Sequence, residues 1–162
     1  MPARIPGAGA LNALVGRLTG RLSAAARIPP GGPVGPLAEG ARGGPWRVLV
    51  AEDSMRPALE PGDWLLVDPT IRTWPRRDSI VVVREPDGDL LAIKRVAARP
   101  GDVIRTATGP IRLGPSEAWL LGDDRAVSRD SRMYGPVGLD RLLARAWFRY
   151  GPAGRTGRLK PR

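Results

Sequence analysis

The 162-residue chain carries a net charge of +10 and contains neither cysteine nor histidine. These absences exclude disulfides, thiolate metal sites, a cysteine nucleophile and a Ser-His-Asp triad, so hydrolytic chemistry would need another base, and we expect no cofactor. Five arginines and one glutamate lie in residues 1–45, four basic residues in 151–162, and 17 basic against 15 acidic residues in 46–150. Because the two ends carry the excess charge, we expect an anionic membrane surface as partner, and no nucleic acid.

The N-terminal segment, residues 1–45, is basic and rich in proline and glycine. Within it, residues 10–27 place apolar side chains at helical spacing with arginines between them, which predicts a short amphipathic helix. The apolar positions are Leu11, Leu14, Val15, Leu18 and Leu22. This stretch is too short and too charged to span a bilayer but suits its interface, and a transit peptide or a poorly ordered tail are the alternatives. Residues 28–45 have the composition of a linker.

From Trp46 onward the pattern changes to short strands bounded by glycine, proline and aspartate. The expected strands are residues 46–52, 63–68, 78–85, 90–98, 102–107, 118–123 and 142–150. Residues 85–90 (EPDGDL) predict a hairpin turn, since Asp-Gly is a common hairpin dipeptide. The sequence therefore predicts a mainly β domain over 46–150, either a small barrel or packed sheets, followed by a basic C-terminal tail over 151–162.

Residues 54–63 (SMRPALEPGD) hold a serine just before an expected strand, followed by two prolines and a Gly-Asp turn. One interpretation is that this rigid turn presents the Ser54 hydroxyl as a nucleophile. The other is that the segment only connects two strands.

Lys94 stands out because only it and Lys160, among 26 basic residues, are lysines. It lies in an expected strand between apolar residues, where burial would disfavour its ammonium form. An arginine effectively cannot lose its proton, whereas a buried lysine can. Lys94 is thus a candidate general base for a serine. The alternative is a strand lysine whose ammonium group reaches water.

A third polar segment, residues 122–137, follows an apolar strand and by itself is typical of a solvated loop. Taken in order, SMRPALEPGD (54–63), IKRVAARPGD (93–102) and GDDRAVSRDSRMYGPV (122–137) resemble the bacterial signal peptidase I family and its mitochondrial inner-membrane relatives. The resemblance covers about residues 48–150 and implies a β domain of the signal-peptidase and LexA type.

The resemblance implies a Ser/Lys dyad in which Ser54 is the nucleophile and Lys94 the general base, with Ser128 orienting the lysine. Asp130 and Arg132 would form a supporting ion pair, and the Ser54 N–H would help to hold the oxyanion. Substrates would be precursor polypeptides with small residues at the first and third positions before the cut. Such a peptide would bind as an added strand against an apolar lining. The residues expected to form this lining are Val48, Val50, Met55, Leu59 and Ile93.

Several features differ from the family pattern, and two of them bear on the oxyanion site and on location. Glu52 stands where the family usually has glycine or serine, and a carboxylate cannot donate to an oxyanion unless it is protonated. No transmembrane anchor is visible in the sequence, so we expect peripheral or weak association with the cell membrane, with a cytoplasmic location as the alternative.

Three other functions stay open at this point. The first is a dedicated maturation protease, such as the one for nickel superoxide dismutase. The second is a self-cleaving regulator of the LexA type, for which residues 1–45 offer only one weak helix. The third is a degenerate family member that binds peptides or membranes without cutting them.

Overall fold

The computed structural model describes residues 26–27, 46–88 and 90–161, with residues 26, 27 and 46 described by their backbone alone. Within these residues the chain is mainly β, as the sequence predicts. The strands are β1 (Ala26–Arg27), β2 (Trp46–Val50), β3 (Trp64–Asp68), β4 (Ile80–Arg84), β5 (Leu91–Ala98), β6 (Val103–Thr106), β7 (Gly109–Arg112), β8 (Glu117–Leu121), β9 (Val137–Gly138), β10 (Leu142–Gly151) and β11 (Gly157–Arg158). The short helices are η2 (Asp53–Met55), α1 (Ser131–Tyr134), η3 (Leu139–Arg141) and η4 (Ala153–Arg155).

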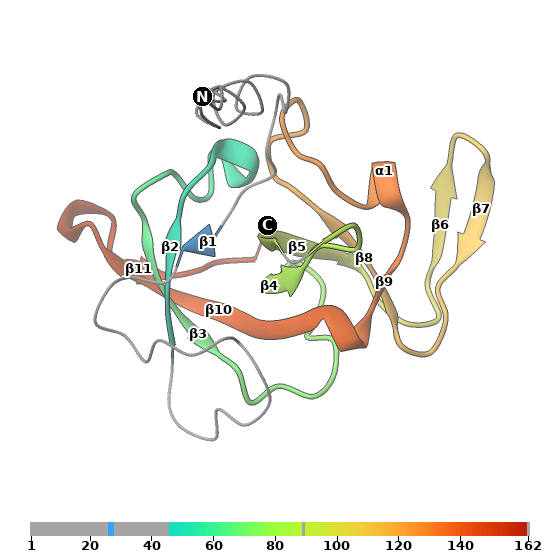
Figure 1. The fold of residues 1–162 in the computed structure, drawn as a ribbon, viewed down its shortest axis with the longest axis horizontal. Helices are drawn as coiled ribbons and strands as arrows, with labels where there is room; N and C mark the ends of the chain where they lie inside the picture. The colour runs from blue at the N-terminus through green and yellow to red at the C-terminus, as the bar shows by residue number, and fades with distance from the viewer. Residues whose placement is uncertain (1–25, 28–45, 89, 162) are drawn as a thin grey trace, which may run out of the picture.

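Nine strands form one antiparallel sheet in the order β1-β2-β3-β10-β4-β5-β8-β9, and β11 pairs with β10 beside this path. Among the described strands, β9 at the end of this order does not pair with β1 at its start, so the sheet is open and does not form a closed barrel. The long strand β10 links the two halves, since it pairs with both β3 and β4. The β6–β7 hairpin forms a separate ribbon that projects from one side of the body (Figure 1).

Each of the seven segments expected to be strands overlaps one, and the predicted hairpin turn joins β4 to β5. The sequence analysis missed β7, β9 and β11, which are short or held by long-range partners. The predicted helix over 10–27 lies outside the described residues, except for Ala26 and Arg27. For these two residues the prediction was wrong, because they pair as a strand with the edge of β2.

The core explains why the centre of β5 is buried. One apolar cluster joins β2, β3 and β10, and a second lies on the other face of β4 and β5 around Trp74. Alternate residues of β5 enter the two clusters, with Ile93 in the first and Ala92 and Val96 in the second. Lys94 therefore stands in a strand that is covered on both faces, where an ammonium group loses its hydration.

The C-terminal segment folds back onto the sheet. Strand β11 pairs with β10, and Leu159 packs against the first core cluster. Arg155 forms ion pairs with Glu60 and with Asp63. The basic segment that the sequence sets apart as residues 151–162 thus contacts the body through both charges and an apolar side chain.

Candidate active site

Ser54 and Lys94 lie side by side although 40 positions separate them in the chain. Ser54 is in the helical turn η2 directly after β2, and Lys94 is in the middle of β5. The Lys94 Nζ donates a hydrogen bond to the Ser54 Oγ at 3.3 Å. Ser54 is 2% exposed and Lys94 is fully buried. The structure therefore brings together the serine and the lysine that the sequence analysis selected.

The surroundings of Lys94 favour loss of its proton. Burial lowers the pKa of the Lys94 amino group, and this effect exceeds the opposing attraction of the carboxylates of Glu85, Asp130 and Glu52. The positive charge of Arg132 lowers the pKa further. A lysine whose pKa falls toward neutral pH has a larger neutral fraction, which is the form that can accept a proton from a hydroxyl.

The third polar segment is fastened to the backbone of the serine. The Asp124 N–H donates to the Ser54 carbonyl at 3.0 Å, and the Ser128 N–H donates to the Asp124 carbonyl at 3.0 Å. Gly122 makes this approach sterically feasible, because a Cβ on it would lie 2.1 Å from the Ser128 Oγ and 2.6 Å from the Ser54 carbonyl oxygen. The first and third motifs, residues 54–63 and 122–137, are thus in direct contact.

Asp130 and Arg132 form the ion pair that the resemblance implies. Asp130 is fully buried, caps helix α1, and accepts hydrogen bonds from the Gly122 N–H at 2.9 Å and from the Arg132 guanidinium at 2.6 Å. Burial opposes ionisation of Asp130, but the hydrogen bonds from Arg132 and Gly122 outweigh it and lower its pKa. The Ser128 hydroxyl is buried near Gly122 and close to the Asp130 carboxylate, whose pKa it also helps to lower. The role of Ser128 in orienting Lys94 stays a prediction.

Three aspartates that follow glycines in the motifs have a structural use that the sequence analysis did not assign. Asp63 pairs with Arg149, Asp102 pairs with Arg77, and Asp123 pairs with Arg95. The Arg95–Asp123 pair is bidentate, at 2.8 Å and 2.6 Å, and both side chains are buried. Removal of one partner of such a pair typically destabilises a fold by about 3–5 kcal/mol. A Gly-Asp dipeptide occurs in each of the three motifs, and this recurrence was the sequence signal for these ion pairs.

The five apolar residues predicted to line the substrate site lie together. Val48, Val50, Met55, Leu59 and Ile93 all belong to the first core cluster, and none is more than 5% exposed. Met55 connects this cluster to the serine, because it follows Ser54 directly in η2. Strand β1 pairs with the edge of β2 in this region, with Ala26 opposite Val50. Contact between these residues and a substrate stays a prediction.

Glu85 is a residue that the sequence analysis missed. It follows β4, is 3% exposed, and lies 3.6 Å from a guanidinium nitrogen of Arg129. Among the charges near Lys94, that of Glu85 opposes the lowering of the lysine pKa most strongly. A glutamate at the start of a hairpin turn gives no sign of this in the sequence, because its approach to Lys94 depends on the pairing of β4 with β5.

Residues 46–117 match the family described as signal peptidase, peptidase S26. The chain is 37% identical over 121 residues to the mitochondrial ATP-independent inner membrane protease subunit 1b of Arabidopsis thaliana, covering 64% of this chain and 72% of that protein. It is 34% identical over 122 residues to the mouse mitochondrial inner membrane protease subunit 2, covering 68% and 70% of the two chains. It is 30% identical over 152 residues to the probable signal peptidase I-2 of Synechocystis, covering 70% and 69%.

These matches and the β scaffold around a buried serine define a peptidase of the serine type. The chain belongs to the signal peptidase I family, peptidase S26. In the part of the chain that the structure describes, no helix has the length and apolar character needed to cross a bilayer.

Proposed function

We propose that this protein is an endopeptidase that removes signal peptides or pro-peptides after small residues by means of a Ser54/Lys94 dyad. The observation that carries the proposal is the 3.3 Å contact between the Lys94 Nζ and the Ser54 Oγ, with both side chains buried. The names of the relatives support precursor proteins as the substrate class, since they are signal peptidases and inner membrane proteases.

In the proposed reaction the neutral Lys94 amine accepts the proton of the Ser54 hydroxyl as the Oγ attacks the scissile carbonyl. The oxyanion that forms is held in part by the Ser54 N–H. When the tetrahedral intermediate collapses, the Lys94 ammonium gives its proton to the leaving amine and an acyl ester remains on Ser54. Lys94 then activates a water molecule in the same way, and hydrolysis of the ester restores the serine.

Two structural features support binding of the substrate as an added strand. The edge of β2 accepts a strand, as its pairing with β1 demonstrates, and β2 leads directly into the turn that holds Ser54. The apolar residues Val48 and Val50 of β2 would offer small, dry subsites that admit alanine and exclude charged side chains. The small residues before the cut would then lie along β2. We place the protein at a membrane, where such precursors occur.

The test is cleavage of a fluorogenic peptide with alanine at the first and third positions before the cut, with the products identified by mass spectrometry. Ser54→Ala and Lys94→Arg should each lower kcat by at least about 100-fold, since guanidinium cannot act as the base. The double variant should lose little more, because the two groups act as one unit.

Lys160→Arg is the matched control, because Lys160 is the other lysine of the chain and lies in the C-terminal segment. It should keep full activity. A Lys94→Arg variant that cleaves at an appreciable rate would contradict a base role for Lys94. A folded wild-type protein that cleaves no such peptide would favour a dedicated maturation protease or a degenerate member, in which Glu52 marks the lost oxyanion donor.

A further inference from the structure

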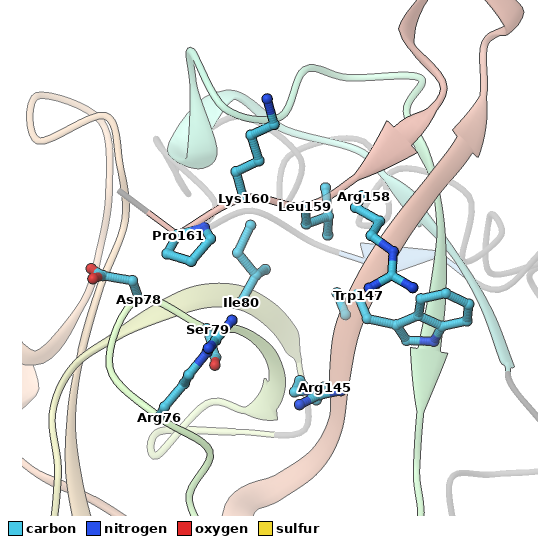
Figure 2. A pocket seen from close by; sticks show the side chains of 11 residues that line it. Arg76, Asp78, Ser79, Ile80, Arg145, Trp147, Arg158, Leu159, Lys160 and Pro161 are labelled. Carbon is cyan, nitrogen blue, oxygen red and sulfur yellow. The ribbon is translucent and has the colours of Figure 1, made fainter.

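A cavity of about 370 Å³ lies apart from the dyad, and none of the residues placed at the dyad lines it. Three segments form its walls: residues 76–80 before and at the start of β4, residues 145–147 of β10, and residues 158–161 (Figure 2). We call this cavity the basic pocket, because Arg76, Arg145, Arg158 and Lys160 all line it.

An irregularity in β10 brings these segments together. The pairing of β10 with β3 shifts register between Ala146 and Phe148, so Trp147 has no partner in that ladder. The Trp147 carbonyl instead accepts a hydrogen bond from the Leu159 N–H at 3.1 Å. This contact and the β10–β11 pairing hold residues 158–161 over the strand. The remaining wall, residues 76–80, is held by Arg95, whose guanidinium donates a hydrogen bond to the Asp78 carbonyl at 2.7 Å.

The basic pocket gathers cations that no carboxylate of the described residues neutralises at close range. Six arginines outside it do form ion pairs with carboxylates, namely Arg77, Arg95, Arg129, Arg132, Arg149 and Arg155. Among the described residues, none of the four cations of the basic pocket forms an ion pair within 4.0 Å. Asp78 is the one carboxylate in the lining, and it lies on the opposite side from Arg158 in Figure 2.

Arg145 adds a second observation. Its Nε is buried and has no hydrogen-bond partner within the described residues. Asp68 faces it across the β3–β10 ladder, and the charge of Arg145 helps to lower the pKa of that carboxyl, but the carboxylate accepts its hydrogen bonds from Thr70. A buried guanidinium nitrogen without an acceptor is costly for the fold, and an anion in the pocket would supply the acceptor.

We propose that the basic pocket binds the phosphate group of an anionic phospholipid head group. Four cations that form no ion pair within 4.0 Å among the described residues, gathered around one cavity, suit a phosphodiester, which carries a negative charge and several acceptor oxygens. A lipid is favoured over free phosphate because Trp147, Leu159 and Pro161 line the same cavity, and tryptophan beside basic residues suits the polar boundary of a bilayer. The pocket is independent of the dyad, so this proposal stands or falls apart from the proposed function.

The test measures binding of the full chain to vesicles of phosphatidylcholine alone and of phosphatidylcholine with phosphatidylglycerol, by co-sedimentation at constant salt. Arg158→Gln should lower the partition coefficient on the anionic vesicles about fivefold, the factor that corresponds to about 1 kcal/mol per basic residue at such a surface. Arg145→Met should lower it at least as much. Neither variant should change peptide cleavage in solution.

Arg105→Gln is the matched control, since Arg105 is also exposed, carries the same charge, and lies in the separate β6–β7 ribbon. Arg105→Gln should change the partition coefficient less than about twofold. An equal loss of binding in Arg105→Gln and Arg158→Gln would show a general attraction between anionic vesicles and a basic protein, and would overturn the proposal that the basic pocket binds lipid. The indole fluorescence should shift on anionic vesicles, and Trp147→Phe should abolish most of that shift. Equal binding to both vesicle types, full displacement by millimolar inorganic phosphate, or binding to an oligonucleotide in place of vesicles would each overturn the proposal.

Discussion

Gly122 lies at the contact between the third motif and Ser54, the proposed nucleophile, and Gly122→Ala tests how closely the site depends on that contact. The new Cβ would lie 2.1 Å from the Ser128 Oγ and 2.6 Å from the Ser54 carbonyl oxygen. The hydroxyl can rotate, but the carbonyl belongs to the backbone that carries the nucleophile. To restore a separation of 3.0–3.4 Å, the Ser54 carbonyl must move by about 0.4–0.8 Å. Displacements of about 1 Å in a catalytic group cost roughly 100-fold in rate.

We therefore expect Gly122→Ala to lower kcat roughly 30–100-fold in the peptide assay, with a smaller effect on KM. Gly154→Ala is the matched control, because a Cβ there meets nothing within 4 Å, and it should keep full activity. A folded Gly122→Ala protein with wild-type kcat, as judged by circular dichroism and thermal melting, would refute the reasoning.

Two further predictions concern the base and the substrate edge. Glu85→Gln removes a charge that opposes the lowering of the Lys94 pKa, so the rise of kcat/KM with pH should move to lower pH, whereas Arg132→Gln should move it to higher pH. Shifts of the same sign in both variants would show that these charges do not act through Lys94. A chain that begins at Pro45 lacks β1 and leaves the edge of β2 unpaired by that strand, so it should cleave the peptide with a lower KM and an unchanged kcat. An unchanged KM would mean that the substrate does not bind at this edge.

Local patterns made most of the body predictable. The strands alternate with Gly-, Pro- and Asp-rich turns, and Gly62 and Gly101 adopt positive φ values, as turn glycines often do. Ser54 and Lys94, the predicted nucleophile and base, lie in hydrogen-bond contact. The regular pairing of β4 with β5 fixes the position of the lysine in the sheet. What the sequence did not reveal depends on contacts between distant segments. Strand β11 and Leu159 are held by β10, and the Arg145 Nε lacks an acceptor while Asp68 accepts its hydrogen bonds from Thr70.

The distribution of charge around Lys94 bears on the proposal that this lysine acts as the base in a strongly basic chain without histidine. Three carboxylates near a lysine would normally keep it protonated, and Glu85, Asp130 and Glu52 do act in that direction. Two of the three are near arginines of their own: Arg132 binds Asp130 at 2.6 Å, and Arg129 lies 3.6 Å from Glu85. These arginines reduce the negative field that reaches the amine, and burial of Lys94 then decides the sign of its pKa shift. Since arginine keeps its proton, it can lie next to the proposed base without competing for the proton that this base would accept. The preference for arginine throughout the chain and the lysine at position 94 are thus two parts of one electrostatic arrangement.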